Sequence, residues 1–176
     1  MKKLLPLSLI ILFCILIGTA VNSLAQDNKF TGVKICSACH KGQKGNMIYD
    51  KWLKTKHAEA YKTLENEKSK ELAKKKGLKN PPTEADECLK CHATGYFEKD
   101  RQLASNKKED GVTCEACHGP GSAYKSSHGK EKKEDGIKKG LIIGSGEEKI
   151  CKKCHNSESP TFAGFNYKKD WEKIKH

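Results

Sequence analysis

The apolar positions of this chain are distributed unevenly, with the longest run at the N-terminus. Lys2 and Lys3 precede the apolar stretch LLPLSLIILFCILIGTA, which the polar VNSLAQD follows. A positive flank, an apolar stretch and small residues at Ser23 and Ala25 are typical of a secretory signal peptide cleaved after Ala25. The alternative is an uncut membrane anchor, but a run of about 17 residues that contains Pro6 would only just span a bilayer.

The pattern therefore divides the chain into a signal peptide, residues 1–25, and one domain, residues 26–176. Cys14 belongs to the discarded segment. No later stretch is apolar enough to cross a membrane, so we expect no stable membrane anchor after cleavage. The export signal predicts that the domain works in the periplasm or is otherwise exported, where thiols tend to oxidise.

The rest of the pattern predicts short helices joined by irregular loops. Residues 47–77 are rich in helix formers and end at a glycine with two prolines beyond, which predicts one long helix or two short ones. Residues 83–95 predict a helix with Thr83 as its N-cap and Gly95 near its end. Further helices are expected over residues 147–155 and 168–176.

Residues 129–146 are rich in lysine and glycine and contain a single apolar stretch, LIIG, a possible strand or tucked loop. Hydrophobic residues make up only 36% of the chain and charged residues 32%. Such a composition leans toward disorder because it offers too little apolar surface to offset the conformational entropy of folding. Something other than aliphatic side chains must supply the core.

The cysteines indicate what supplies the core. After Cys14, every cysteine belongs to one of four C-x-x-C-H motifs. The motifs are CSACH (Cys36, Cys39, His40), CLKCH (Cys88, Cys91, His92), CEACH (Cys114, Cys117, His118) and CKKCH (Cys151, Cys154, His155).

C-x-x-C-H is the attachment signature of c-type haem. Two thiols about one helical turn apart can add to the two vinyl groups of one porphyrin, and the histidine then binds iron. Disulfides or Cys₄ zinc sites would use the same cysteines, but neither needs a histidine after each pair. The sequence therefore predicts four haem c groups. The expected fold is mostly α with irregular loops, a small multihaem cytochrome c fold whose core is four packed haems.

Three histidines lie outside the motifs: His57, His128 and His176. Electron-transfer haems usually fill both axial positions, so three spare histidines can complete three haems. The fourth is left open or takes a weaker ligand, such as Met47 or a lysine. Each spare histidine also has an ordinary interpretation: an exposed helix residue at 57, a loop residue at 128 and a frayed terminus at 176.

Two segments carry a family resemblance. GVTCEACHGPGSAYKSSH, residues 111–128, and WLKTKHAEAY, residues 52–61, resemble the tetrahaem cytochromes named for a five-five-four-nanometre absorption band, whose type member accepts electrons from hydroxylamine oxidoreductase. The resemblance runs from the first motif to the C-terminus. It implies these ligand pairs: His128 with His40 at the first haem, His57 with His155 at the fourth, and His176 with His118 at the third. It also implies that the second haem, on His92, is five-coordinate.

The formal charge of +12 invites a nucleic-acid interpretation. An exported haem protein without interleaved aromatic residues does not fit it, and haem propionates offset much of the excess. The lysine clusters AKKKGLK and GKEKKEDGIKKG either steer acidic redox partners or form an ordinary solvated face.

We expect an electron carrier, not an enzyme, that exchanges electrons with donor and acceptor cytochromes or a multihaem oxidoreductase. The rival hypotheses are a reductase of nitric oxide or another small nitrogen oxide that works at the His92 haem, and a subunit of a haem filament or larger redox complex.

Overall fold

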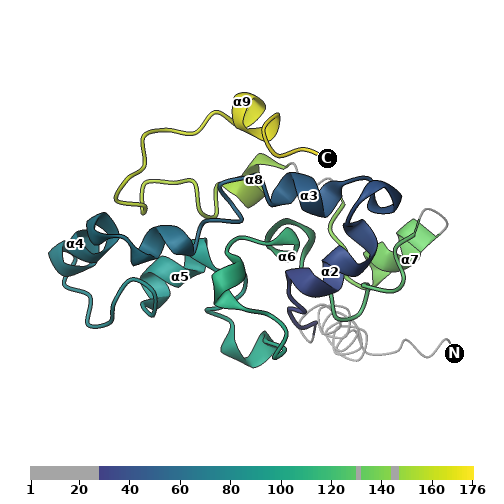
Figure 1. Ribbon diagram of the computed structural model, residues 1–176, viewed down its shortest axis with the longest axis horizontal. Coiled ribbons are helices and arrows are strands. Elements are labelled where there is room, and N and C mark those ends of the chain that lie inside the picture. The colour runs from purple at the N-terminus through teal and green to yellow at the C-terminus, as the bar shows by residue number, and fades with distance from the viewer. Residues whose placement is uncertain (1–27, 130–131, 144–146) are drawn as a thin grey trace, which may run out of the picture.

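The computed structural model describes residues 28–129, 132–143 and 147–176 (Figure 1). The predicted signal peptide, residues 1–25, lies outside these ranges. Within them every regular element is helical, and the single β-type pairing is an isolated bridge between Phe30 and Gln102. The prediction of a mostly α fold with irregular loops is confirmed. None of the described helices is both long enough and apolar enough to span a membrane.

The α-helices are short and are separated by turns and extended segments. In chain order they are α2 (Val33–His40), α3 (Ile48–Trp52), α4 (Glu67–Lys75), α5 (Asp86–His92), α6 (Cys114–His118), α7 (Lys133–Lys138), α8 (Glu148–Cys151) and α9 (Tyr167–Trp171). In the part of the chain that the structure describes, 3-10 turns also occur: η1 (Gln43–Gly45), η2 (Lys62–Glu65), η3 (Lys99–Arg101) and η4 (Lys108–Asp110).

The helices form an elongated arrangement (Figure 1). Helices α4 and α5 lie at one end, α7 lies at the other, and α6 lies between them. Helix α2 packs against α6 and α3. Helix α9 stands apart from this body at the end of a long extended segment (Figure 1).

Residues 47–77 form two short α-helices, α3 and α4, with turns and η2 between them. The second helix starts where it does because the Asn66 side chain caps it, accepting a hydrogen bond from the Ser69 N–H at 2.9 Å. The helix of the second motif begins at Asp86, so the prediction of Thr83 as its N-cap is wrong. The Pro81 carbonyl accepts the N–H groups of Glu84 and Ala85, and this turn delays the start of the helix.

The other predicted helices are present but shorter than the sequence suggested. Helix α8 ends at Cys151 and α9 ends at Trp171. Residues 141–143 of the LIIG stretch form no strand, and the Ile142 side chain is 40% exposed. The Ile142 N–H donates to the His118 carbonyl at 3.0 Å, so this loop is held against the third motif.

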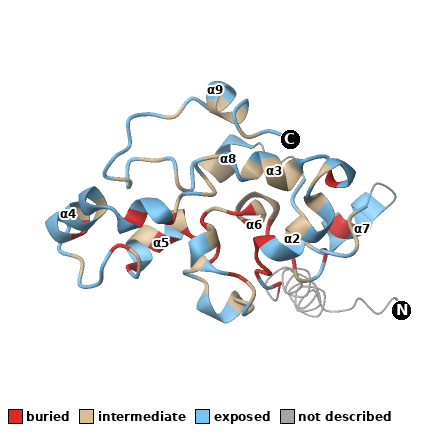
Figure 2. Cartoon of the chain, viewed as in Figure 1, coloured by how far each residue is buried: buried red, intermediate tan, exposed pale blue. Residues whose placement is uncertain are grey.

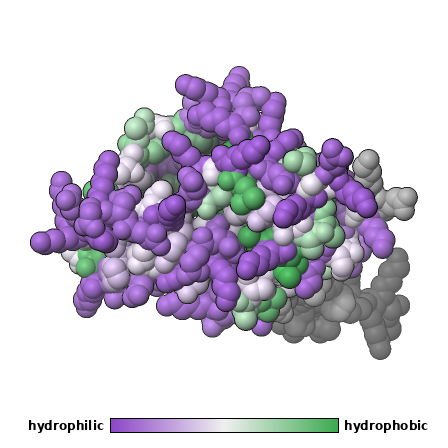
Figure 3. Space-filling view, in the orientation of Figure 1, coloured by the Kyte–Doolittle hydropathy of each residue, from purple (hydrophilic) through white to green (hydrophobic). Residues whose placement is uncertain are grey.

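The apolar core formed by side chains is small, as the composition indicates. One cluster of buried residues stands out: Tyr61, Leu64, Leu89 and Ala93, with Cys88 and Tyr96 packed on it. Figure 2 shows buried positions near α5, α6 and the loops between them, while α4, α7 and α9 are largely exposed. The surface is mostly hydrophilic, with scattered apolar patches (Figure 3).

Candidate haem-binding sites

Each C-x-x-C-H motif coincides with a short helix or its last turn. Helices α2, α5 and α6 each end at the motif histidine. The fourth motif starts at the end of α8, and the N–H groups of Cys154 and His155 both donate to the Cys151 carbonyl, at 3.1 and 2.9 Å. Residues three apart lie on the same side of a helical turn, so each motif presents two thiols to the same side.

Six of the seven histidines lie in pairs, each joining a motif histidine to one from outside the motifs. The Nε2 atoms of His40 and His128 are 3.3 Å apart, and the centres of their rings are 5.6 Å apart. The ring centres are 6.0 Å apart both for His57 with His155 and for His118 with His176.

These distances suit two imidazoles on one metal ion. A histidine nitrogen lies about 2 Å from the metal it binds, so two nitrogens on opposite sides of one ion are about 4 Å apart and their ring centres about 6 Å apart. The residues present therefore fit three haem irons, each held by two histidines.

Several rings are oriented by hydrogen bonds from Nδ1 to backbone carbonyls. These bonds are His128 to Tyr124 at 2.8 Å, His118 to Ile142 at 3.0 Å, His176 to Ile174 at 3.2 Å and His92 to Ala60 at 2.7 Å. An Nδ1–H that donates to a carbonyl fixes the tautomer and leaves Nε2 unprotonated for a metal. Phe165 also stacks on His155, with ring centres 5.0 Å apart.

Burial favours the neutral form of several of these imidazoles. It lowers the pKa of His40, His57 and His118, and the charge of the paired histidine lowers each further. The neutral ring is the form that binds a metal ion.

His92 differs from the other histidines. Its Nδ1 lies 2.7 Å from the Ala60 carbonyl and 3.2 Å from the Thr63 hydroxyl. No other histidine ring pairs with it in the part of the chain that the structure describes.

The motifs also contact one another through their thiols. The side chain of Cys114, together with burial, raises the pKa of Cys36, and α2, which carries the first motif, packs against α6, which carries the third. The side chain of Cys154 lowers the pKa of Cys91 to about 7, and the Cys154 thiol donates to the carbonyl of Lys90, in the second motif, at 3.9 Å. The first motif therefore lies beside the third, and the second beside the fourth.

A third contact joins these two pairs of motifs. Burial raises the pKa of Cys117 to about 11, and the charge of Cys151 raises it further. The third motif is therefore close to the fourth.

Comparison with known proteins points to the same class of protein as the motifs do. The family profile described as cytochrome c554 and c-prime matches residues 35–119, which hold the first three motifs. Cytochrome c-554 of Nitrosomonas europaea is 38% identical over 117 residues, which are 64% of this chain and 47% of that protein. The chain is a c-type cytochrome. It spans about half the length of this curated relative. No solved structure matches it.

The cytochrome anchors His57 through residues before the third motif. The Trp52 indole N–H donates to the Val112 carbonyl at 2.8 Å, and the Val112 N–H donates to the His57 carbonyl at 2.9 Å. Gly111 has φ +73° and lies so close that a Cβ there would be 2.6 Å from the His57 carbonyl oxygen. The two segments that carry the family resemblance therefore contact each other.

A functional residue that sequence reasoning missed is Glu115, which stands between the two cysteines of the third motif. Its side chain is buried, and its carboxylate accepts hydrogen bonds from the N–H groups of Thr31, Gly32 and Gly121. It thereby ties α6 to the start of α2 and to the turn that leads to His128. The only sign of this role in the sequence is that an acidic residue stands between the two cysteines of the third motif.

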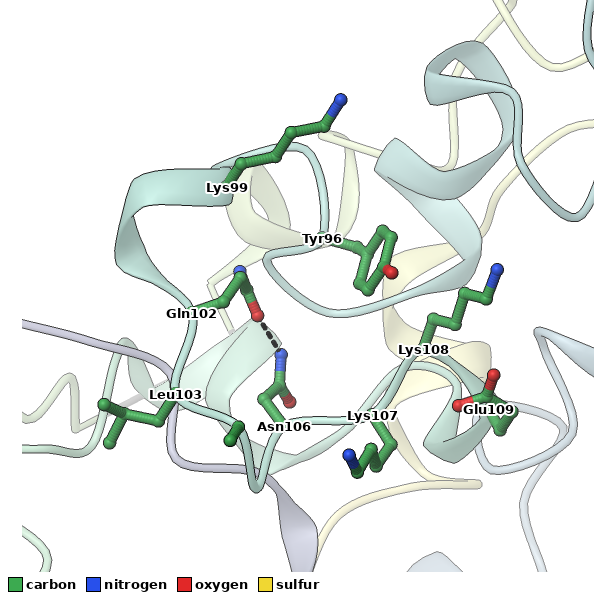
Figure 4. Close-up of a pocket in the computed structure, with 9 residues that line it drawn as sticks. Tyr96, Lys99, Gln102, Leu103, Asn106, Lys107, Lys108 and Glu109 are labelled. Carbon is green, nitrogen blue, oxygen red and sulfur yellow. Dashed lines mark hydrogen bonds between the residues drawn. The ribbon is translucent and has the colours of Figure 1, made fainter.

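Tyr96 lines a pocket of about 520 Å³ (Figure 4). The ring packs on the cluster around Leu89, and the Lys108 ammonium lies over the rings of Tyr96 and Tyr61, at 5.7 and 5.6 Å. His92 does not line this pocket, which is formed mainly by residues 102–109. Phe97, the next residue after Tyr96, is 51% exposed.

Proposed function

We propose that the chain is a periplasmic electron-transfer cytochrome of the five-five-four type, with four haems bound through its four motifs. Three irons are held by the pairs His40 with His128, His57 with His155, and His118 with His176. The iron of the second haem, on His92, is five-coordinate. The observation that carries the proposal is the pairing of the histidines, which brings together the pairs that the family resemblance implies.

A bound haem c supplies an iron that gains and loses one electron. The residues of the chain hold the ligands in place. Backbone carbonyls orient the rings of His118 and His128, and burial lowers the pKa of His57, so that its ring is neutral. Rigid ligation of this kind limits rearrangement when the charge on the iron changes.

The proximity of the motifs supports an order in which electrons would pass. Helix α2 packs against α6, which places the first motif beside the third, the charge of Cys151 acts on Cys117, and the Cys154 thiol donates to the carbonyl of Lys90, in the second motif, at 3.9 Å. Porphyrins held by these thiols would be neighbours in the same order. The proposed path runs from the first haem to the third, then to the fourth and the second.

Helix α5, which carries the motif of the second haem, lies with α4 at one end of the molecule (Figure 1). Lys74, Lys75 and Lys76 are exposed at the end of α4. Burial and the charge of Glu87 raise the pKa of Cys88, and the charge of Lys76 opposes this rise, so Lys76 lies near the second motif. This surface suits an acidic redox protein, such as a multihaem oxidoreductase or another cytochrome.

A second candidate function is reduction of nitric oxide or another small nitrogen oxide at the His92 haem. It is favoured by one observation: within the described residues, His92 is the motif histidine without a second histidine beside it. An enzyme of this kind consumes nitric oxide with a chemical reductant, whereas a carrier exchanges electrons without turnover.

Two measurements on the mature holoprotein test the proposal. Mass spectrometry should show about 2.5 kDa above the mature polypeptide, the mass of four haems. Electron paramagnetic resonance of the oxidised protein should show three low-spin irons and one high-spin iron. Fewer than four haems, or free thiols at Cys88 and Cys91, overturn the haem count. Four low-spin irons overturn the open site and leave electron transfer alone.

A further inference from the structure

Glu115 is a buried acidic residue whose carboxylate accepts hydrogen bonds from N–H and O–H groups. The residue is 2% exposed. The Thr31 N–H lies 2.9 and 3.0 Å from its two oxygens, and the Gly32 and Gly121 N–H groups lie at 2.7 and 2.6 Å. The Thr31 hydroxyl donates a further bond at 3.2 Å.

No lysine, arginine or histidine forms an ion pair with this carboxylate among the residues that the structure describes. All of its donors are N–H or O–H groups, which suit an ionised carboxylate that accepts through both oxygens. Buried charges are screened much less than surface charges, because solvent ions do not reach them. The field of Glu115 therefore extends to its neighbours.

Those neighbours belong to two haem sites. Thr31 and Gly32 immediately precede α2, which carries the first motif, while Glu115 itself lies in α6, the helix of the third. The pKa of Tyr124 is raised by burial and then by the charge of Glu115, and the Tyr124 ring contacts His128 with ring centres 5.7 Å apart. The same charge acts on the thiols of Cys36 and Cys114.

We propose that Glu115 is a positioning residue that lowers the reduction potentials of the first and third haems, those on His40 and His118. A fixed negative charge stabilises the oxidised iron, which carries one more positive charge than the reduced iron, so it opposes uptake of an electron. The charge of Glu115 is not among those that shift the pKa values of the thiols of the second and fourth motifs, so we expect it to act less on the haems there. This inference rests on the proposed function, because it needs haems on the first and third motifs.

The test is a redox titration of the holoprotein in which the haems are resolved by paramagnetic resonance. Glu115→Gln keeps the shape of the side chain and removes the charge. It should move the reduction equilibrium of the first and third haems toward the reduced state by about tenfold, which is 59 mV for one electron. The reduction equilibrium of the fourth haem should change much less.

The matched control is Glu87→Gln. Glu87 directly precedes Cys88 of the second motif and is exposed, so solvent screens its charge. The same substitution there should leave all four equilibria within about twofold of the unmodified protein. A purely structural role for Glu115 predicts loss of stability without selective movement of two potentials.

A second variant keeps the proposal testable if Glu115→Gln fails to take up four haems. Thr31→Val preserves the volume of a fully buried side chain and removes one donor from the carboxylate while its charge remains. The charge is then less compensated, and the same two haems should become harder to reduce. The proposal is overturned if neither assembled variant shifts the reduction potentials of the first and third haems more than the control does. A wrong haem count in the unmodified protein refutes the proposed function instead.

Discussion

Gly111→Ala should dislodge His57, the proposed second ligand of the fourth haem. The added Cβ would lie 2.6 Å from the His57 carbonyl oxygen and 3.0 Å from that of Ala58, both of them backbone atoms. The residue also has φ +73°, a conformation that costs a residue with a Cβ about 1–2 kcal/mol. Relief of the overlap breaks the hydrogen bond from the Val112 N–H to His57, worth about 1 kcal/mol.

Overpacking adds about 1–3 kcal/mol, so the total loss of stability should be about 3–6 kcal/mol. The chain offers a matched control. Gly77 has φ +68°, but no atom lies within 4 Å of a Cβ placed there. Gly77→Ala should therefore lower the stability only through the unfavourable backbone conformation, by about 1–2 kcal/mol.

The assay combines guanidinium unfolding, followed by far-ultraviolet circular dichroism, with the spin state of the oxidised haems. The Gly111 variant should unfold at a clearly lower denaturant concentration than the Gly77 variant. It should also gain one high-spin iron, because the carbonyl that is pushed aside belongs to His57 itself. Equal midpoints and unchanged spin states in the two variants would refute the argument.

Three other predictions address the remaining ligands and the partner surface. Deletion of His176 should turn one low-spin haem high-spin in paramagnetic resonance spectra, and added imidazole should restore it; an unchanged spectrum would show that His176 is only a terminal residue. His128→Ala should create a second iron that binds carbon monoxide, at the first haem, so that a titration of the reduced protein gives two equivalents instead of one. Replacement of Lys74, Lys75 and Lys76 by glutamate should slow reduction by an acidic donor about tenfold at low salt and little at high salt; a loss that persists at high salt would argue against electrostatic steering.

The haem attachment positions were predictable because their chemistry requires a fixed local spacing. Two thiols and a histidine within one helical turn are visible in any C-x-x-C-H sequence. The helical character was predictable for a similar reason, since each motif needs a turn of helix to present its thiols.

The positions that depend on distant segments were not predictable in this way. Thr83 looked like an N-cap, but the Pro81 carbonyl takes up the neighbouring N–H groups first. Glu115 carries no local signal, because its donors come from residues 31–32 and from Gly121. The role of Gly111 is equally hidden, since only the approach of His57 from another segment explains why a side chain is excluded there.

The contacts between thiols of different motifs also constrain how this cytochrome is made. The side chains of Cys36 and Cys114, and those of Cys91 and Cys154, are near enough to shift each other's pKa, whereas attachment of a porphyrin requires two reduced thiols of the same motif. In an oxidising compartment, neighbouring thiols of different motifs can oxidise to disulfides, which would remove the thiols that porphyrin attachment needs. We therefore expect porphyrin attachment to precede the packing of these helices, on a chain that is still extended.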